Sequence, residues 1–222
     1  MMRAFIFDMD GVLCDSEAVI AAAACRLFKE RYNVAVTAED FAPFIGTGEE
    51  RYLCGVAEKV GISLTMPDDK NETYRLYAEI AREQMNPIRG VVEFLHRSAA
   101  AGIRLAVATS ADEFKMHVNL TAIGVEEELF NARVTGCQVE HKKPAPDIFL
   151  KAAELLDCTP AECIVFEDAE NGVQAAKAAG MKCCGITSSF SADRLAAAGA
   201  DWTASDFQSL PPDLTAQLPA SA

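Results

Sequence analysis

The spacing of apolar residues along the chain changes its period twice. A short apolar run at residues 4–7 has the pattern of a buried strand. Residues 16 to about 85 then repeat apolar side chains at helical spacing, and we expect helices over 16–33, from 37 onward, over 49–60 and over 70–84, with no strand among them. The pattern predicts an all-helical insertion directly after the first strand.

From residue 87 onward, strand-like runs alternate with helical patterns. We expect strands over 104–108, 132–136, 163–166 and 182–186, with helices over 91–101, 112–123, 146–156 and 172–179. Gly102, Gly124 and Gly180 fall just after predicted helices, where a glycine commonly ends the last turn. This alternation favours a parallel sheet with crossover helices, so the fold class is α/β.

Two carboxylates follow the first strand directly. Asp8 and Asp10 are two positions apart, and they would project from the strand end into the crevice where an open α/β sheet binds ligands. Two neighbouring acids repel each other unless a cation or a shared proton relieves them, and we favour a divalent metal, most plausibly Mg²⁺. The alternative for the pair alone is a solvated turn, because aspartate is common in turns.

Three later segments place further candidate catalytic side chains at predicted strand ends or in a loop. Residues 105–110 form a strand ending in a hydroxyl, residues 142–149 supply a lysine, and residues 164–173 end a strand in an acidic pair. Together with residues 8–16, which read Asp-Met-Asp-Gly-Val-Leu-Cys-Asp-Ser, they resemble the ordered motifs of the haloacid dehalogenase-like hydrolases. The resemblance is to the branch that contains β-phosphoglucomutase and many small-molecule phosphatases.

The resemblance implies a domain layout and a reaction. Residues 1–15 and 87–222 would form a Rossmann-like catalytic core, and residues 16–86 an inserted α-helical cap domain that selects the substrate. The enzyme would be a phosphomonoester hydrolase acting on a small phosphorylated metabolite with Mg²⁺ as cofactor. Cys14 and Asp15 would shape the hinge into the cap.

Roles for individual residues follow from the same resemblance. Asp8 would be the nucleophile that forms an aspartyl-phosphate, and Asp10 the acid/base. Lys143 would neutralise the phosphate and orient Asp8, whereas Lys142 is expected to be a solvated loop residue. The side chain of Thr109 and the N–H of Ser110 would hold a phosphate oxygen, or alternatively only cap the next helix. The expected metal ligands are Asp8, Asp10, Glu167 and Asp168, with Glu167 binding the ion directly or through its waters.

The predicted cap contains a glycine-interrupted loop that would face the substrate. Its candidate binding residues are Gly46, Thr47, Gly48, Glu49 and Arg51. The chain departs here from β-phosphoglucomutase, which has a histidine at the position of Ile20 and an arginine at the position of Glu49. Both losses favour a phosphatase, although Arg51 could partly replace the arginine. A sugar phosphomutase therefore stays the alternative function.

Composition limits the classes of partner and the cellular location. A net charge of −13 and a pI near 4.7 argue against nucleic-acid binding. No apolar run approaches the roughly 20 residues of a membrane span, and the chain enters a strand without a signal-peptide pattern. We expect no membrane partner, a cytoplasmic location and a monomer. The eight cysteines are expected to be buried free thiols, and the three scattered histidines to lie on helix surfaces or loops.

Overall fold

The computed structural model describes residues 2–45 and 48–216 of the chain. The chain divides into two compact units, one made of Met1–Asp15 and Pro87–Ala222 and the other of Ser16–Asn86. Within the described residues, each helix is too short or too polar to cross a bilayer.

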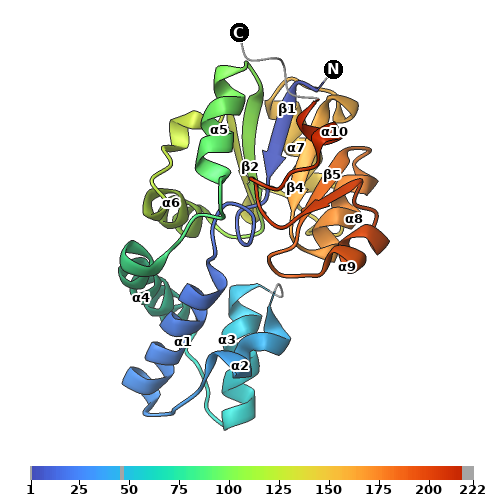
Figure 1. The fold of residues 1–222 in the computed structure, drawn as a ribbon. Helices are drawn as coiled ribbons and strands as arrows, with labels where there is room; N and C mark the ends of the chain where they lie inside the picture. The colour runs from blue at the N-terminus through green and yellow to red at the C-terminus, as the bar shows by residue number, and fades with distance from the viewer. Residues whose placement is uncertain (1, 46–47, 217–222) are drawn as a thin grey trace. The chain divides into compact units, whose positions relative to one another are not determined.

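The first unit is built on a six-stranded parallel sheet. Its strand order is β3-β2-β1-β4-β5-β6, which is the doubly wound Rossmann order. The order reverses between β1 and β4, and ligands bind at such a switch point beyond the carboxyl ends of the strands. The strands are β1 (Ala4–Phe7), β2 (Arg104–Thr109), β3 (Ala132–Thr135), β4 (Cys163–Glu167), β5 (Lys182–Ile186) and β6 (Trp202–Ala204). Figure 1 shows β1 in the interior of this sheet.

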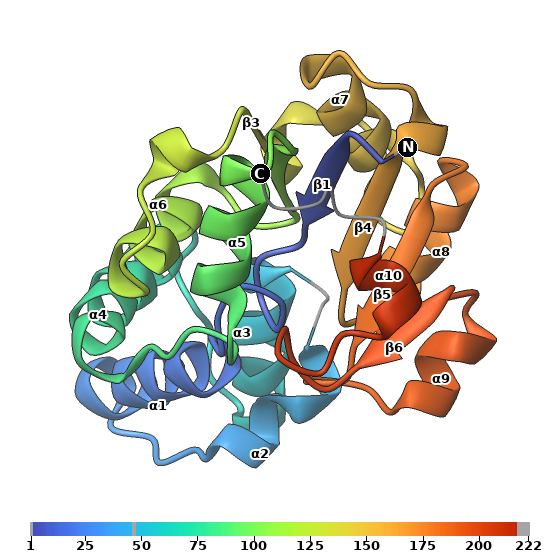
Figure 2. The ribbon, with the colours of Figure 1, turned by 45° about the horizontal axis from the view of Figure 1, so that its top comes forward.

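Helices connect the strands and cover both faces of the sheet (Figures 1 and 2). Helices α7 and α8 pack on one face, where their apolar residues join the alternate strand residues Ala4, Ile6 and Val165 in one core cluster. Helix α5 covers the other face near β2. The helices of this unit are α5 (Val91–Ala100), α6 (Glu113–Ala122), α7 (Asp147–Leu155), α8 (Glu170–Ala178), α9 (Ala192–Ala197) and α10 (Pro212–Thr215).

An aromatic cluster fills the face that α5 covers. Phe7 stacks on Phe166 with ring centroids 4.9 Å apart, and Phe5 stacks on Phe94 at 5.6 Å. Phe207 packs against Phe94 at 5.1 Å. Because the side chains of β1 alternate between two buried faces, the whole strand is enclosed, and its end is held in a fixed position.

The second unit is helical. It contains α1 (Glu17–Tyr32), α2 (Ala38–Phe41), α3 (Glu49–Val60) and α4 (Asp68–Gln84), with no strand among its described residues. Helices α1 and α4 pack along each other. The buried Asp69 at the start of α4 accepts a hydrogen bond from the hydroxyl of Tyr32 at 2.5 Å and pairs with Arg31 at 2.8 Å.

The predicted elements are present, with small differences at their ends. The α/β class with a parallel sheet is confirmed. Strands β2 and β4 each extend one residue further than expected, to include Thr109 and Glu167. Helices α4 and α8 each begin two residues earlier than expected, at Asp68 and Glu170. The three glycines expected after helices have φ near +75°, the left-handed region that such positions need.

The eight cysteines are free thiols, as predicted. The expectation that they are buried holds for Cys14, Cys163, Cys183 and Cys184, but it is wrong for Cys137, which is exposed. Cys137 lies in a short 3₁₀ turn, Gly136–Gln138, that follows β3 on the way to the loop before α7. An apolar residue in such a connecting turn faces water because loops run over the surface.

Candidate active site

The first acidic residue continues the pairing of β1. Asp8 follows Phe7, and its N–H donates to the carbonyl of Phe166 at 2.9 Å, so its backbone is fixed against β4. Gly11 then turns the chain with a φ of 75°. A side-chain Cβ at Gly11 would lie 2.0 Å from Oδ2 of Asp168. Only glycine therefore allows this loop to approach the acidic pair at the end of β4 so closely.

Lys143 joins the ends of β1 and β4. Its Nζ lies 2.5 Å from Oδ1 of Asp8 and 2.6 Å from Oε1 of Glu167. The side chains of Lys143, Asp8 and Glu167 are 5%, 11% and 2% exposed, so this is a buried ion triad. Burial disfavours the charge on Lys143, but the two carboxylates outweigh that effect and raise the pKa of Lys143. The lysine therefore carries its charge at neutral pH.

Glu167 is held through both of its carboxylate oxygens. Oε1 accepts from Lys143, whereas Oε2 accepts from the N–H groups of Asp168 and Ala169, each at 2.8 Å. A Cβ on Gly172 would lie 1.8 Å from Oε1, so the first turn of α8 packs directly on this carboxylate. These contacts orient Lys143 toward Asp8 and leave Glu167 little freedom to bind other groups.

Asp168 lies at the same edge, beside the loop that follows β5. The hydroxyl of Ser189 donates to Oδ2 of Asp168, and that of Ser188 lies 3.5 Å from the same oxygen. Ser188 also donates to the carbonyl of Gly11 at 2.5 Å. Burial raises the pKa of Asp168, and the nearby charges of Glu167 and Asp8 act in the same direction. The two serines were not predicted from the sequence.

The site holds more negative than positive charge. Burial raises the pKa of Asp8 to about 7, and although Lys143 opposes this shift, Glu167 and Asp10 add to it. A divalent cation at this edge would favour the ionised forms of Asp8 and Asp168. Their hard carboxylate oxygens are the ligands that Mg²⁺ prefers, and Mg²⁺ commonly uses only one or two carboxylates together with waters. The donor set therefore fits the cation.

A larger cluster of side-chain ligands is not assembled here. Among the residues that the structure describes, no three His, Cys, Asp or Glu side chains are grouped to hold a metal ion. The four-carboxylate set of Asp8, Asp10, Glu167 and Asp168 stays a prediction. Both carboxylate oxygens of Glu167 and of Asp10 accept hydrogen bonds, whereas the contacts described above for Asp8 and Asp168 each involve a single oxygen, which makes these two the stronger candidates for direct ligands.

Asp10 contacts helix α6, which the sequence did not predict. Its Oδ2 lies 3.0 Å from Nζ of Lys115, and its Oδ1 accepts from Nδ2 of Asn119 at 3.3 Å. A signal for this contact exists in the sequence. The buried residues of α6 are Lys115, Met116, Asn119 and Leu120, so two polar side chains interrupt the face that should be apolar.

The end of β2 brings Thr109 to the same edge of the sheet. Thr109 is 1% exposed, and its hydroxyl accepts from the N–H of Ala111 at 3.1 Å. The carbonyl of the preceding residue, Ala108, lies 3.5 Å from Nζ of Lys143. The alternative that Thr109 and Ser110 only cap the next helix is wrong, because α6 begins at Glu113 and Asp112 caps it by accepting from the N–H of Lys115; that they hold a phosphate oxygen stays a prediction.

Lys142 is less solvated than expected. Although the residue is exposed overall, its Nζ donates to the carbonyl of Gly136. It is thus anchored to the turn after β3, whereas Lys143 reaches the acidic cluster. The three histidines, His96, His117 and His141, are exposed, as the sequence predicts.

The candidate residues of the second unit are described only in part. Gly46 and Thr47 lie outside the described residues. Gly48 precedes α3 with a φ of 89°, and Glu49 is in the first turn of that helix. Arg51 pairs through Nη1 with Glu58, with contacts of 2.8 and 2.9 Å, and its guanidinium lies 5.2 Å from the ring centroid of Phe44.

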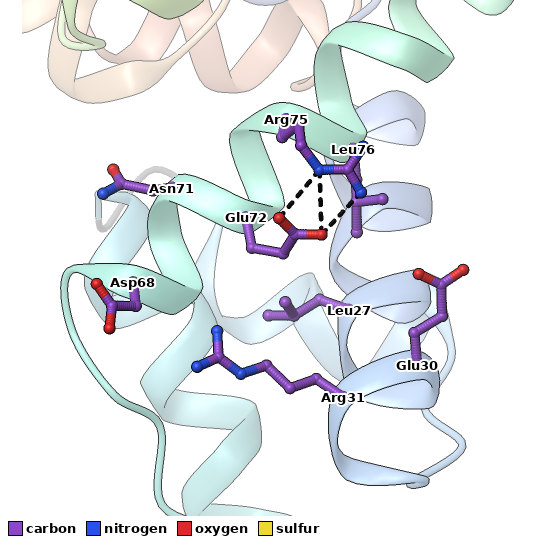
Figure 3. A pocket seen from close by; sticks show the side chains of 8 residues that line it. All are labelled: Leu27, Glu30, Arg31, Asp68, Asn71, Glu72, Arg75 and Leu76. Carbon is purple, nitrogen blue, oxygen red and sulfur yellow. Dashed lines mark hydrogen bonds and ion pairs between the residues drawn. The ribbon is translucent and has the colours of Figure 1, made fainter.

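A separate hollow of about 620 Å³ lies in the second unit. Figure 3 shows its lining side chains on α1 and α4. Its two arginines already face carboxylates, since Arg31 pairs with Asp69 and Arg75 with Glu72. A hollow whose cations are neutralised in this way offers no site for a phosphate, and the chemistry is concentrated at the sheet edge of the first unit.

Comparisons with known proteins find relatives of this chain. The family model described as haloacid dehalogenase-like hydrolase matches residues 5–186. Suppressor of Quenching 1, a chloroplastic protein of Arabidopsis thaliana, is 41% identical over 201 residues, which cover 89% of this chain and 19% of that protein. The chain thus spans about a fifth of that relative's length.

Two further relatives match over most of their own length. A phosphorylated carbohydrates phosphatase of Thermotoga maritima is 35% identical over 185 residues, covering 82% of this chain and 83% of that protein. The crystal structure of CbbY from Rhodobacter sphaeroides in complex with phosphate matches with a TM-score of 0.81 and 26% identity, covering 93% of this chain and 95% of that one. The chain therefore belongs to the haloacid dehalogenase-like hydrolases, a generally metal-dependent family, in the branch of phosphatases and β-phosphoglucomutase-like proteins.

Proposed function

We propose that this chain is a Mg²⁺-dependent phosphatase that hydrolyses a small phosphorylated metabolite through an aspartyl-phosphate on Asp8. The observation that carries the proposal is the contact of Lys143 Nζ with Oδ1 of Asp8 at 2.5 Å. It places a buried cation beside a carboxylate at the switch point of a doubly wound sheet, which is the position where such sheets bind ligands.

In the first step, an oxygen of Asp8 attacks phosphorus. A bond forms between Asp8 and phosphorus, and the bond from phosphorus to the substrate oxygen breaks. Asp10 gives its proton to the departing alkoxide. An ionised carboxylate can attack at neutral pH, but it must approach a dianionic phosphate, so positive charge is required beside it. The ammonium group of Lys143 supplies part of that charge, and Thr109 is a candidate donor to a phosphate oxygen.

In the second step, water hydrolyses the acyl-phosphate. Asp10, now a carboxylate, accepts a proton from the water, whose oxygen bonds to phosphorus while the bond to Asp8 breaks. Inorganic phosphate leaves, and both aspartates return to their starting states. Mg²⁺, bound by Asp8 and Asp168, would neutralise charge on the phosphate when present. Glu167 and the two serines hold the lysine and Asp168 in place for this arrangement.

The substrate class rests on the relatives. The name of the Thermotoga maritima relative states that it acts on phosphorylated carbohydrates, and the Rhodobacter sphaeroides structure contains phosphate. We infer a phosphorylated sugar or a similar polyol phosphate as the substrate. The helical unit of residues 16–86 would select it, through Gly46, Thr47, Gly48, Glu49 and Arg51, because the sheet edge recognises little beyond the phosphate.

A sugar phosphomutase is the alternative. Such an enzyme must hold the second phosphate of a bisphosphate intermediate, and Arg51 is the cation proposed for this task. Arg51 is in an exposed ion pair with Glu58, which costs little to break. The preference for a phosphatase rests on the loss of the histidine and the arginine at the positions of Ile20 and Glu49 and on the relatives named as phosphatases. The phosphatase therefore remains the preferred function.

The test is phosphate release from a panel of sugar phosphates, nucleotides and phosphorylated cofactors, with and without Mg²⁺. We expect metal-dependent release from a few sugar phosphates, abolished in Asp10→Asn. Absence of release from every compound would reject the proposal. If a hexose phosphate is instead isomerised after a bisphosphate is added, the mutase assignment is correct.

A further inference from the structure

Helix α6 presents two polar side chains to the interior of the first unit. Lys115 is 7% exposed and Asn119 is fully buried, and the two lie one helical turn apart. Their neighbours on the same face are Met116 and Leu120, which are apolar. Lysine and asparagine are rarely buried, since removing them from water costs free energy unless partners compensate. An apolar pair at these positions would favour stability, so the polar pair calls for a functional reason.

Both side chains converge on Asp10. Nζ of Lys115 lies 3.0 Å from Oδ2, and Nδ2 of Asn119 lies 3.3 Å from Oδ1. Each of the two carboxylate oxygens is thus contacted by a different residue of the same helix. Two contacts from one rigid element fix both the position and the rotation of a carboxylate, whereas one contact would leave it free to rotate.

The helix itself is fixed at its start. The carboxylate of Asp112 accepts from the backbone N–H of Lys115 at 3.1 Å, which caps the first turn of α6. The residue that reaches Asp10 is therefore also the residue whose backbone the cap holds. A carboxylate that moves protons needs this precision, because proton transfer requires hydrogen-bond distance in the reacting geometry.

We propose that Lys115 and Asn119 are positioning residues that hold the carboxylate of Asp10 for proton transfer. The inference rests on the proposed phosphatase function, in which Asp10 is the acid/base. Neither residue has to touch the substrate. Their loss should impair the two steps that use Asp10, protonation of an alkoxide and activation of water, while attack by Asp8 itself is left intact.

The experiment compares two substrates in Lys115→Met and Asn119→Leu, both with Mg²⁺. p-Nitrophenyl phosphate has a leaving group that needs no proton, so the first step should still release p-nitrophenolate in a rapid burst close to one equivalent. Steady-state turnover should then fall by about 10- to 100-fold, because water attack on the aspartyl-phosphate needs Asp10. An alkyl phosphate should give the same loss without a burst, with KM nearly unchanged.

Two further variants separate positioning from simple structural damage. Lys115→Arg keeps a cationic donor and should recover part of the turnover. In the Asp10→Asn background, where turnover is abolished, the rate of the p-nitrophenolate burst should be the same with and without Lys115→Met, because its effect operates through Asp10. The matched control is Lys151→Met, which removes an exposed lysine of α7 that pairs with Glu154 at 2.8 Å and should behave like the wild type.

The outcomes distinguish this inference from the function on which it rests. A wild-type enzyme without phosphatase activity on either substrate would reject the proposed function. An active wild type whose Lys115→Met and Asn119→Leu variants turn over normally would overturn the positioning role alone. The positioning role is also overturned if Lys115→Met slows the p-nitrophenolate burst in the Asp10→Asn background. Should Lys115→Met not fold, Asn119→Leu and Lys115→Arg decide the question by the same readouts.

Discussion

Nζ of Lys143 lies 2.5 Å from Oδ1 of Asp8, although the two residues lie far apart in the sequence. The same nitrogen lies 2.6 Å from Glu167, so one buried cation joins residues at the ends of neighbouring strands β1 and β4. This contact gives a local reason for the placement of Asp8. A carboxylate that stands beside a fixed ammonium group is oriented and can be approached by a phosphate.

Replacement of Lys143 by methionine should lower both the catalytic activity and the free energy of unfolding. Asp8 and Glu167 would be left as buried carboxylates without their cation, a change that costs about 3–5 kcal/mol in comparable buried pairs. We expect kcat to fall by about 10²-fold or more, because the charge beside the transferred phosphoryl group is lost. Urea unfolding and steady-state kinetics would measure the two effects.

Lys142→Met is the matched control for the Lys143→Met variant. Lys142 donates to the carbonyl of Gly136, whereas Lys143 contacts Asp8 and Glu167. We expect its kcat to stay near that of the wild type. An equal loss of activity in Lys142→Met would contradict the distinct roles of the two adjacent lysines.

Asp8→Asn should stabilise the protein while abolishing turnover. The pKa of Asp8 is raised to about 7 by burial, so the native state binds its proton more tightly than the unfolded state does. Wild-type stability should therefore fall as pH rises from about 4 to about 7, and the asparagine variant should lack this loss.

Unfolding free energies at pH 5 and pH 8, measured with a metal chelator present, provide the test. Because one pKa unit corresponds to ~1.4 kcal/mol, we expect the variant to exceed the wild type by roughly 1 kcal/mol or more at pH 8. A variant that is less stable than the wild type at pH 8 would show that the ionised Asp8–Lys143 contact outweighs the desolvation of the carboxylate.

The sequence predicted the sheet better than it predicted the contacts around the site. Buried strands are apolar runs bounded by turn residues, so their centres are recognisable. Their ends are not, because Thr109 and Glu167 are polar and yet continue the parallel ladder. The parallel arrangement also explains why the motif residues Asp8, Thr109 and Glu167 reach one edge, since each follows or ends a parallel strand.

The contacts of Asp10 and Asp168 depended on tertiary packing that no local pattern specifies. Lys115 lies in helix α6, and which of its residues face Asp10 depends on how this helix packs against the rest of the unit. Ser188 and Ser189 follow β5, and ordinary loop serines give no signal of their partners. The polar residues that interrupt the otherwise apolar face of α6 were a sequence signal for the contact with Asp10.

The capping box at Thr159 should make stability depend on pH in acid. Hydrogen bonds from the N–H and hydroxyl of Thr159 and the contact with Arg3 lower the pKa of Glu162 to about 2. A carboxyl whose pKa is lowered by folding stabilises the native state above its unfolded pKa, near 4.5, and loses this contribution as pH falls toward 2. Glu162→Gln should be less stable than the wild type at pH 7.

That difference should shrink as the pH is lowered through this window. Urea unfolding of both proteins at pH 7, 4 and 3 would measure it. A difference between Glu162→Gln and the wild type that stays constant across the three pH values would contradict the ionic character of the cap. Glu154→Gln, at an exposed site of α7, controls for the general effect of removing one surface charge.

Thiol labelling should distinguish the exposed cysteine from the buried ones. Burial raises the pKa of Cys163 and of Cys184 to about 12, so their thiols are both inaccessible and protonated. Cys137 is exposed and should react first with a disulfide reagent in the native protein. Cys137→Ser should lack this fast phase; if the phase persists there, the environment of Cys137 is not as described.

The most direct test of the central claim is to trap the covalent intermediate. The enzyme would be mixed with Mg²⁺ and its best substrate from the phosphate-release panel, quenched in acid during turnover, and analysed by intact-protein and peptide mass spectrometry. The account predicts the added mass of one phosphoryl group on the peptide that contains Asp8, and no such addition or turnover in Asp8→Asn. Turnover by Asp8→Asn, or a phosphoryl group on a different residue of the wild type, would contradict it.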